Sequence, residues 1–347
     1  MENISSALLD WFYKNHRILP FRTDPSPYHV WLSEIMLQQT RVSAALPYYE
    51  RFLAALPDIP ALAACEEEKL HKLWEGLGYY SRVRNLQKAA RIVCEQYGGQ
   101  LPADYDALRA LPGIGDYTAG AVASISFGIP VPAVDGNVLR VFSRLYNDPA
   151  AVTEPAVKKG VHRPRDGAPA AGCARRLQSG PYGAGSAGLR AERCAPVRKT
   201  ARLPTCAPPV LRALHWSCPA SSAKPRRLQP VTLALLESPA GFLLQQRPQK
   251  GLLAGLWQPV LWEGEALAAG EVLARLQAMG VNTGTAAPEA LPAAKHIFSH
   301  IEWHMNGILL HVPAQDAPAG CVWASREALQ AEYTLPGAFK AYRKLIV

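Results

Sequence analysis

The spacing of apolar residues in the first part of the chain is that of an α-helical domain. Apolar positions recur three and four residues apart, as in Leu86, Ala90 and Val93, which places them on one face of a helix. Proline and glycine interrupt this spacing near Pro25 and Gly98. The pattern predicts a globular helical domain over residues 1–158.

The last part of the chain, residues 227–347, has a different pattern, which predicts a mixed α/β domain. Short apolar runs bounded by turn residues are typical of strands, and longer runs with helical spacing are typical of helices. The expected elements are strands at Val231–Leu236, Gly241–Gln246 and His304–Val312 and a helix at Glu271–Met279.

Between these two parts, residues 159–226 have an unusual composition. From residue 160 to residue 226 the chain contains no Ile, Phe or Met and is crowded with Arg, Pro, Gly and Ala. This composition is typical of a disordered basic linker, although so long a linker inside a compact enzyme is uncommon. Asp166 and Glu192 are its only acidic residues, so much of the net charge of +9 lies here. The global charge therefore says little about a nucleic-acid partner.

Length and composition predict a protein of about two domains without a membrane-spanning segment. The chain has 347 residues, 49% of them hydrophobic, which suffices for about two domains. No apolar run approaches the roughly 20 residues of a membrane span, and the N-terminal residues lack the pattern of a signal peptide. We therefore expect a cytoplasmic protein without a membrane partner. The seven cysteines show no metal-site spacing, and disulfides are unexpected in the cytosol.

The most informative motif is a glycine hairpin followed by an aspartate. Leu111–Gly115 predicts a tight turn between two helices, where glycine amides can grip a phosphate. Asp135 follows about twenty residues later, within Pro132–Val138. Together these motifs suggest an enzyme that holds DNA by its backbone and acts at a deoxyribose.

Four ordered motifs resemble the adenine DNA glycosylases that act on 8-oxoguanine:adenine mispairs. They are Trp31–Val42, Gly76–Arg82, the Leu111–Gly115 hairpin and Val134–Val138. The resemblance implies a mainly α helix-hairpin-helix DNA glycosylase core followed by an α/β Nudix-like C-terminal domain. It further implies a monomer that binds double-stranded DNA containing 8-oxoguanine:adenine or guanine:adenine mispairs, and that associates with the nucleoid while it acts.

The resemblance assigns catalytic roles to Glu34 and Asp135. Taken alone, Glu34 is typical of a solvated helix face, and Asp135 of a turn cap before Gly136. In the family the first carboxyl protonates the adenine ring, and desolvation beside Trp31 can raise the pKa of such an acid. The second faces the sugar and stabilises oxocarbenium-like charge, as in glycoside hydrolysis.

Further residues are assigned to DNA binding by the same resemblance. Gln39, Leu77 and Tyr79 correspond to residues that enter the duplex when the adenine is flipped, although Leu77 and Tyr79 taken singly are typical of a core. Tyr117 stands where lyases of the superfamily place a Schiff-base lysine, which predicts a monofunctional hydrolase. Phe21 replaces the tryptophan that usually precedes the family's arginine. The DNA-binding set also includes Arg22, Leu111, Gly113, Gly115 and Asn137.

The C-terminal domain carries the family's recognition motifs. Leu252–Trp257 and His296–Trp303 match the domain that recognises the oxidised guanine, with Phe298, Ser299 and His300 as the loop that touches it in relatives. Alone, this tripeptide is typical of a buried strand. The acidic metal-binding box of Nudix hydrolases is absent from the sequence, which disfavours a nucleotide pyrophosphatase.

The family's 4Fe-4S cluster has no counterpart in the sequence as written. Its four cysteines belong within residues 160–226, and Cys173, Cys194, Cys206 and Cys218 lack their spacing. Codons for Arg176–Leu189 read from the second base permit Asp-Phe-Lys-Ala-Ala-Leu-Met-Glu-Leu-Gly-Ala-x-Val-Cys, which resembles the family just before its first cluster cysteine. Further shifted codons permit three more cysteines with seven, two and five intervening residues, against six, two and five in the family.

We therefore interpret this segment as translated out of register, with no cluster ligands in this chain. The shift removes a glutamate that relatives place near the active site. The favoured function is an adenine DNA glycosylase of base excision repair. The alternative is a catalytically impaired DNA-binding remnant of such an enzyme.

Overall fold

The structure is a computed structural model that describes residues 12–139, 226–285 and 287–346. The chain forms two compact units, one of Met1–Ala64 and Arg84–Ala223, the other of Cys65–Val83 and Lys224–Val347. Residues 159–225 of the segment interpreted as off-register lie outside the described residues. The domain boundaries expected from the sequence, 1–158, 159–226 and 227–347, stay predictions.

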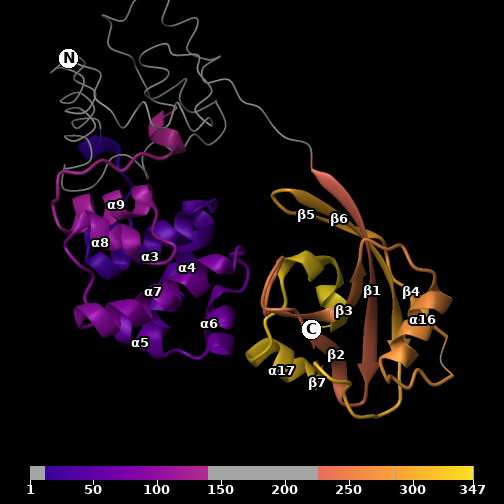
Figure 1. Ribbon diagram of the computed structural model, residues 1–347. Helices are drawn as coiled ribbons and strands as arrows, with labels where there is room; N and C mark the ends of the chain where they lie inside the picture. Colours follow the sequence, from indigo (N-terminus) through magenta and orange to yellow (C-terminus); the bar gives the residue numbers. More distant parts are fainter. Residues whose placement is uncertain (1–11, 140–225, 286, 347) are drawn as a thin grey trace, which may run out of the picture. The chain divides into compact units, whose positions relative to one another are not determined.

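The described part of the first unit is helical (Figure 1). It holds α2 (Pro20–Thr23), α3 (Pro27–Leu37), α4 (Val42–Ala55), α5 (Ile59–Ala64), most of α7 (Ser81–Tyr97), α8 (Tyr105–Ala110) and α9 (Asp116–Ser126). Proline opens α2 and α3 at the first turn, where its missing N–H costs nothing. The core includes the fully buried side chains Trp31, Phe52 and Leu86. The helical expectation for this part of the chain is confirmed.

The second unit contains α6 (Glu67–Trp74) and a seven-stranded sheet. The strands are β1 (Arg227–Ser238), β2 (Gly241–Gln246), β3 (Trp257–Glu263), β4 (Glu289–Ala290), β5 (Ala294–Ile297), β6 (Ile301–His311) and β7 (Cys321–Ala324). Their order is β4-β6-β1-β3-β2-β7, with β5 also paired to β6. Strands β1 and β6 run parallel along eleven residue pairs, and the other pairs are antiparallel.

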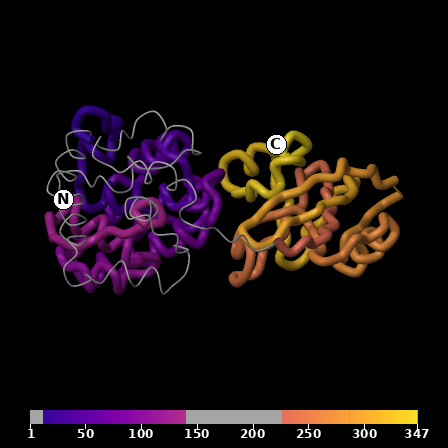
Figure 2. The backbone as a smooth tube through the Cα atoms, turned by 90° about the horizontal axis from the view of Figure 1, so that it is seen from above, coloured from indigo at the N-terminus to yellow at the C-terminus, as the bar shows by residue number. Residues whose placement is uncertain are grey.

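Helices cover both faces of this sheet, as alternate residues of β1 show. Val231, Leu233 and Leu235 face the core formed with the C-terminal segment, which holds α17 (Arg326–Ala331), the 3-10 helix η1 (Gly337–Tyr342) and α18 (Arg343–Ile346). Ala234 and Leu236 face the core formed with α16 (Ala269–Ala278). Figures 1 and 2 show α16 and the C-terminal segment on opposite sides of the strands.

The expected C-terminal elements are confirmed with small shifts of their ends. The first two expected strands are β1 and β2, the expected helix is α16, and the last expected strand is β6. Together with the helical unit they give the expected fold class, a helical core followed by an α/β domain. Among the described residues, no helix combines the length and the apolar character that a membrane crossing needs.

Candidate functional site

Glu34 lies on α3 in an apolar environment, where it is only 7% exposed. All seven residues from Trp31 to Leu37 are buried. The hydroxyl of Tyr117, at the start of α9, donates a hydrogen bond of 2.8 Å to Glu34 Oε2. A buried carboxyl is costly unless it is hydrogen-bonded, so this bond both stabilises and orients the group. The solvated helix face that Glu34 alone suggests is therefore wrong.

Arg22 supplies positive charge to the same region. It lies on α2, where burial and the neighbouring Arg17 lower the pKa of its guanidinium, while Glu34 acts in the opposite direction. Its Nη1 donates to the carbonyl of Arg17 at 3.0 Å. Phe21, which replaces the expected tryptophan, is buried and packs edge-to-face against Tyr49. The aromatic ring of Phe21 is therefore part of the hydrophobic core.

Asp135 is held in place by hydrogen bonds from the residues that follow it. Its Oδ1 accepts from the backbone N–H of Asn137 at 2.9 Å and of Val138 at 2.8 Å, and its Oδ2 accepts from Asn137 Nδ2 at 2.7 Å. Residues 136–139 are helical, so Asp135 is an N-cap. The turn cap that the aspartate alone suggests is confirmed, and it fixes the direction of the carboxylate.

Gly120 in α9 lets the segment before Asp135 approach the helix. A Cβ at this position would lie 2.3 Å from the carbonyl oxygen of Pro132 and 3.1 Å from Cα of Ala133. Since α9 also packs on α3, this close contact places the Asp135 segment on the helix that bonds Glu34. Gly120 is absent from the residues expected from the sequence, although a glycine inside a helical pattern is a signal that could have identified it.

The glycine hairpin connects α8 to α9 as expected. Gly113 has a φ of +78°, which favours glycine, and a Cβ there would lie 2.8 Å from Cβ of Asn85. Leu111 and Ile114 are buried, which anchors the turn, while Gly113 and Gly115 are exposed. Gly115 is the N-cap of α9. The turn therefore presents backbone at a helix N-terminus, where anions are favoured.

The residues expected to enter DNA occupy two turns. Gln39 follows α3 with a φ of +57° and is exposed. The second turn, Gly76–Tyr80, joins α6 to α7, and Tyr79 there is 49% exposed with a φ of +49°. Leu77 in contrast is only 8% exposed. The structure therefore presents Gln39 and Tyr79 at the surface and packs Leu77 inward.

The tripeptide Phe298–His300 forms the turn of the β5–β6 hairpin. The N–H of Phe298 donates to the carbonyl of Ile301 at 2.8 Å, which leaves Ser299 and His300 exposed at the tip. Phe298 packs edge-to-face against the fully buried Trp303, with ring centroids 4.9 Å apart. The buried strand that the tripeptide alone suggests is therefore wrong.

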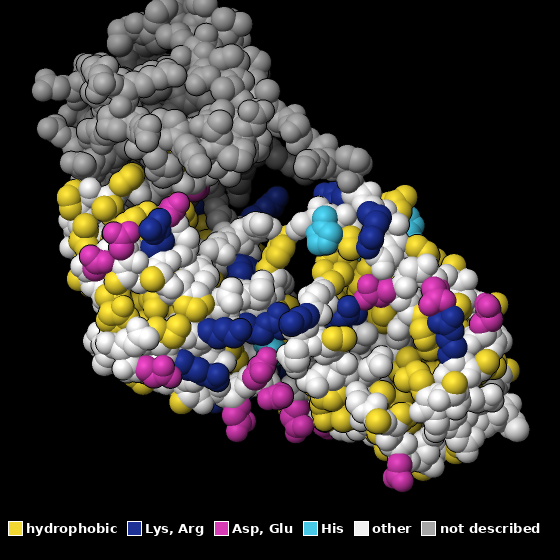
Figure 3. All heavy atoms as spheres, in the orientation of Figure 1, with side chains coloured by type: hydrophobic (Ala, Val, Ile, Leu, Met, Phe, Trp, Pro, Cys, Tyr) yellow, Lys and Arg dark blue, Asp and Glu magenta, His cyan; other side chains and the backbone are white. Residues whose placement is uncertain are grey.

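Histidines lie at and beside this hairpin turn. Figure 3 shows histidines near the hairpin on the visible face of the sheet unit, with Lys or Arg side chains beside them. His296 stacks edge-to-face on Phe298 at 4.6 Å, and burial lowers the pKa of its imidazole. The turn thus carries exposed polar groups next to packed aromatic rings.

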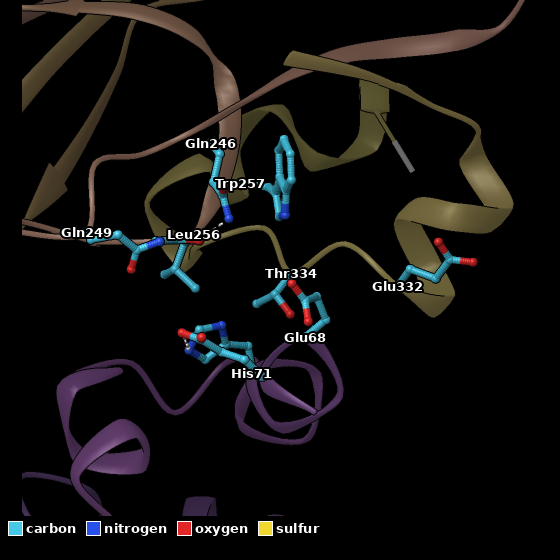
Figure 4. Close-up of a pocket in the computed structure, with 10 residues that line it drawn as sticks. Glu68, His71, Gln246, Gln249, Leu256, Trp257, Glu332 and Thr334 are labelled. Carbon is cyan, nitrogen blue, oxygen red and sulfur yellow. Dashed lines mark hydrogen bonds and ion pairs between the residues drawn. The ribbon is translucent and has the colours of Figure 1, made fainter. Parts of the chain in front are cut away.

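The pocket in Figure 4 belongs to the second unit. On the sheet, Gln246 and Trp257 contribute to it, and Gln246 Nε2 donates to the carbonyl of Gly255 at 3.3 Å. Its lining includes neither Glu34 nor Asp135, nor the tripeptide Phe298–His300. None of these residues expected to act on DNA therefore lines the pocket.

The described residues do not fit an iron–sulfur cluster. Within them, Cys65, Cys94 and Cys321 are free thiols, and no group of three or more His, Cys, Asp or Glu side chains could hold a metal ion. Cys173, Cys194, Cys206 and Cys218 lie outside the described ranges.

Fold and site together define a DNA glycosylase of the helix-hairpin-helix class. Residues 32–163 match the HhH-GPD superfamily of base excision DNA repair proteins, and residues 231–345 match the NUDIX domain. The chain is 33% identical to the adenine DNA glycosylase of Homo sapiens over 400 residues, covering 97% of this chain and 73% of that protein. It therefore belongs to the adenine DNA glycosylase family, whose members are enzymes of base excision repair.

Other similarities cover parts of the chain. The adenine DNA glycosylase of Buchnera aphidicola subsp. Acyrthosiphon pisum is 40% identical over 156 residues, which cover 45% of each chain. The solved structure of a thermostable thymine-DNA glycosylase has a TM-score of 0.48 and 24% identity, and covers 58% of this chain and 92% of that one.

Proposed function

We propose that this protein hydrolyses the N-glycosidic bond of adenine mispaired with 8-oxoguanine or guanine in duplex DNA. The observation that carries the proposal is the buried Glu34 carboxyl, which Tyr117 orients from the helix that follows the glycine hairpin. A buried acid beside a phosphate grip suits an enzyme that holds the DNA backbone and protonates a flipped base.

Glu34 is the general acid in this mechanism. It delivers a proton to the adenine ring, which makes the base a better leaving group. The hydrogen bond from Tyr117 to Oε2 fixes the plane of the carboxyl, so less reorganisation is needed when the base arrives. The nearby Arg22 guanidinium interacts with Glu34, which acts to raise the pKa of Arg22.

Asp135 stabilises the sugar while the bond breaks. The electron pair of the glycosidic bond goes to the adenine nitrogen, and positive charge develops at C1′ of the deoxyribose. The Asp135 carboxylate, oriented by Asn137 and Val138, balances this charge. Water then supplies the hydroxyl group at C1′ and releases a proton, which leaves an abasic site.

Tyr117 also makes the enzyme monofunctional in this proposal. A lyase needs an amine that attacks C1′, and the phenol at this position instead donates to Glu34. We expect borohydride to trap no rapid covalent adduct with substrate DNA. Efficient trapping that disappears when a lysine is replaced would contradict the monofunctional assignment.

Recognition of the oxidised base is assigned to the β5–β6 turn. Ser299 and His300 are exposed on a short hairpin supported by Phe298 and Trp303. Their hydroxyl and imidazole groups can bond the edge of a base. This arrangement supports a role in distinguishing 8-oxoguanine from guanine opposite the adenine.

The test of the proposed function is single-turnover release of adenine from duplexes that carry 8-oxoguanine:adenine, guanine:adenine or thymine:adenine pairs. We expect release from the first two and none from the third. Because the cluster segment is out of register, the protein is assayed as written and with residues 160–226 restored to the family frame. Release from none of the duplexes by the restored protein would overturn the proposal.

One observation favours the second candidate, a catalytically impaired DNA-binding remnant, for the chain as written. The two family matches end at residue 163 and begin again at residue 231, close to the limits of the segment interpreted as off-register. Sequencing the gene across codons 155–230 tests the frame directly. We expect no bound iron in the chain as written and recovery of iron and activity when the frame is restored. Stoichiometric iron in the unrepaired chain would contradict this account.

The proposal places the enzyme in the cytoplasm, acting on nucleoid DNA as a monomer. Fractionation of cells after formaldehyde crosslinking tests the location, and sedimentation of the purified chain tests the oligomeric state. Recovery in the membrane fraction or a stable dimer would contradict these two expectations.

A further inference from the structure

The turn that presents Tyr79 is held in an unfavourable backbone conformation. Gly76, Gly78 and Tyr79 have φ values of +100°, +69° and +49°. A left-handed conformation is readily adopted by glycine but is uncommon for a tyrosine. Something outside the turn must therefore stabilise it.

The structure assigns that role to Arg82, at the start of α7. Its Nη2 donates to the carbonyl of Leu77 at 3.1 Å and to the carbonyl of Gly78 at 3.0 Å. The backbone N–H of Arg82 donates to the carbonyl of Tyr79 at 2.9 Å. One residue therefore bonds three successive carbonyls of the turn.

Aromatic rings hold the Arg82 guanidinium itself. Its central carbon lies 5.3 Å from the ring centroid of Trp74 and 5.6 Å from that of Tyr79, within the range of cation–π attraction. Trp74 is fully buried, and its indole N–H donates to the carbonyl of Gly78 at 3.1 Å. Arg82 and Trp74 thus bond the same carbonyl of Gly78.

Burying the charged guanidinium of Arg82 costs free energy, so packing alone does not explain an arginine at this position. The residue is 9% exposed, and desolvation lowers the pKa of its guanidinium to about 10, an effect that the neighbouring Tyr79 opposes. An apolar side chain of similar volume commonly stabilises a protein as well as a buried charge does. Bonds from the planar guanidinium to two adjacent carbonyls instead fix one backbone geometry.

We propose that Arg82, supported by Trp74, is a positioning residue that holds the Gly76–Tyr80 turn so that Tyr79 projects into damaged DNA. The inference rests on the proposed function, because it gives Tyr79 its role in filling the duplex. Leu77 is the anchor of the turn, since its side chain is buried and its carbonyl is bonded. Tyr79 is the presented group, since its side chain is half exposed.

The test compares Arg82→Met with Lys88→Met in the full chain. Both positions lie on α7, and each substitution removes one positive charge, but Lys88 is exposed and distant from the turn. Binding is measured by fluorescence polarisation on two duplexes, one with an uncleavable adenine analogue opposite 8-oxoguanine and one undamaged. We expect Arg82→Met to reduce the preference for the mispair duplex by about tenfold, while Lys88→Met leaves that ratio unchanged.

Two further variants separate positioning from folding. Trp74→Phe removes the N–H that bonds Gly78 and leaves a smaller ring in the same buried site. We expect a smaller loss of preference together with a lower melting temperature, so binding by this variant is measured well below its melting transition. Arg82→Lys keeps the charge without the planar donors, and we expect it to restore part of the preference lost in Arg82→Met. A melting curve for every variant excludes loss of fold as the cause.

Hydrogen exchange measured by mass spectrometry tests, without DNA, whether Arg82 and Trp74 hold the Gly76–Tyr80 turn. We expect faster exchange in peptides that cover residues 75–80 in Arg82→Met and Trp74→Phe, with no change in peptides from α3. If neither the chain as written nor the frame-restored protein shows a mispair preference, the proposed function fails, and this exchange measurement still tests whether Arg82 and Trp74 hold the turn. Unchanged exchange in both variants, or an unchanged binding ratio in a parent that discriminates, would overturn the inference.

Discussion

The Glu34 site and the β5–β6 turn differ in their exposure to solvent, and each environment suits a different proposed task. Glu34 is buried in an apolar helix and bonded from a second helix, which suits proton transfer to a base taken out of water. Ser299 and His300 are exposed at the end of a short hairpin, which suits contact with a base edge. In the proposed mechanism the buried acid supplies the chemistry, and the exposed turn supplies the discrimination between mispairs.

The largest effect that we expect comes from Glu34→Gln. The substitution keeps size and polarity but removes the transferable proton, so adenine release should fall by about 10²–10⁴-fold. Single-turnover rates on the frame-restored protein measure the loss, and the dissociation constant for an uncleavable duplex should stay the same. Adenine release at close to the parental rate would show that Glu34 is not the general acid.

Gly120→Ala tests whether the position of Asp135 depends on α9. The new Cβ would meet the Pro132 carbonyl at 2.3 Å, so the segment that carries Asp135 must shift. A displacement of about 1 Å can cost about a hundredfold in rate. The matched control is Gly270→Ala in α16, where a Cβ meets no atom within 4 Å. Equal rates for the two variants would show that the position of Asp135 does not depend on Gly120.

Glu34 could be identified from the sequence, whereas the roles of Gly120 and Tyr117 in positioning the site could not. The helical core, the C-terminal α/β order and Glu34 follow from periodicity and from linear motifs, because each lies within a continuous stretch. The Tyr117 bond to Glu34 and the fit of Gly120 against Pro132 depend on packing between segments far apart in sequence. Taken singly, Leu77 and Tyr79 are both typical of a core, and only the tertiary packing shows that Leu77 is buried while Tyr79 is half exposed.

Ser299→Ala combined with His300→Ala tests the discrimination side of the comparison. Loss of contacts to a base edge should reduce the preference for 8-oxoguanine:adenine over guanine:adenine by about 1–3 kcal/mol. The ratio of single-turnover rates on the two duplexes is the measurement, and the melting temperature should change little because both side chains are exposed. A constant ratio would place recognition of the oxidised base elsewhere.

Tyr117→Phe has the smallest effect that we expect. It removes one hydrogen bond to a carboxyl that stays buried, so the rate of adenine release should fall by about tenfold. The loss should be the same for both mispairs, because the phenol serves the acid and not the opposite base. A variant that changes the mispair ratio but not the rate would show that Tyr117 belongs to recognition.

The division between chemistry and discrimination is tested most directly by one crossed measurement. Adenine release is measured under single-turnover conditions for the frame-restored protein, Glu34→Gln, the Ser299→Ala/His300→Ala pair and their combination, each on 8-oxoguanine:adenine and guanine:adenine duplexes. The account predicts that Glu34→Gln slows release equally on both duplexes, with an unchanged ratio, and that the hairpin pair changes the ratio by the same factor with or without Glu34. A Glu34→Gln enzyme with an altered mispair ratio would contradict the account.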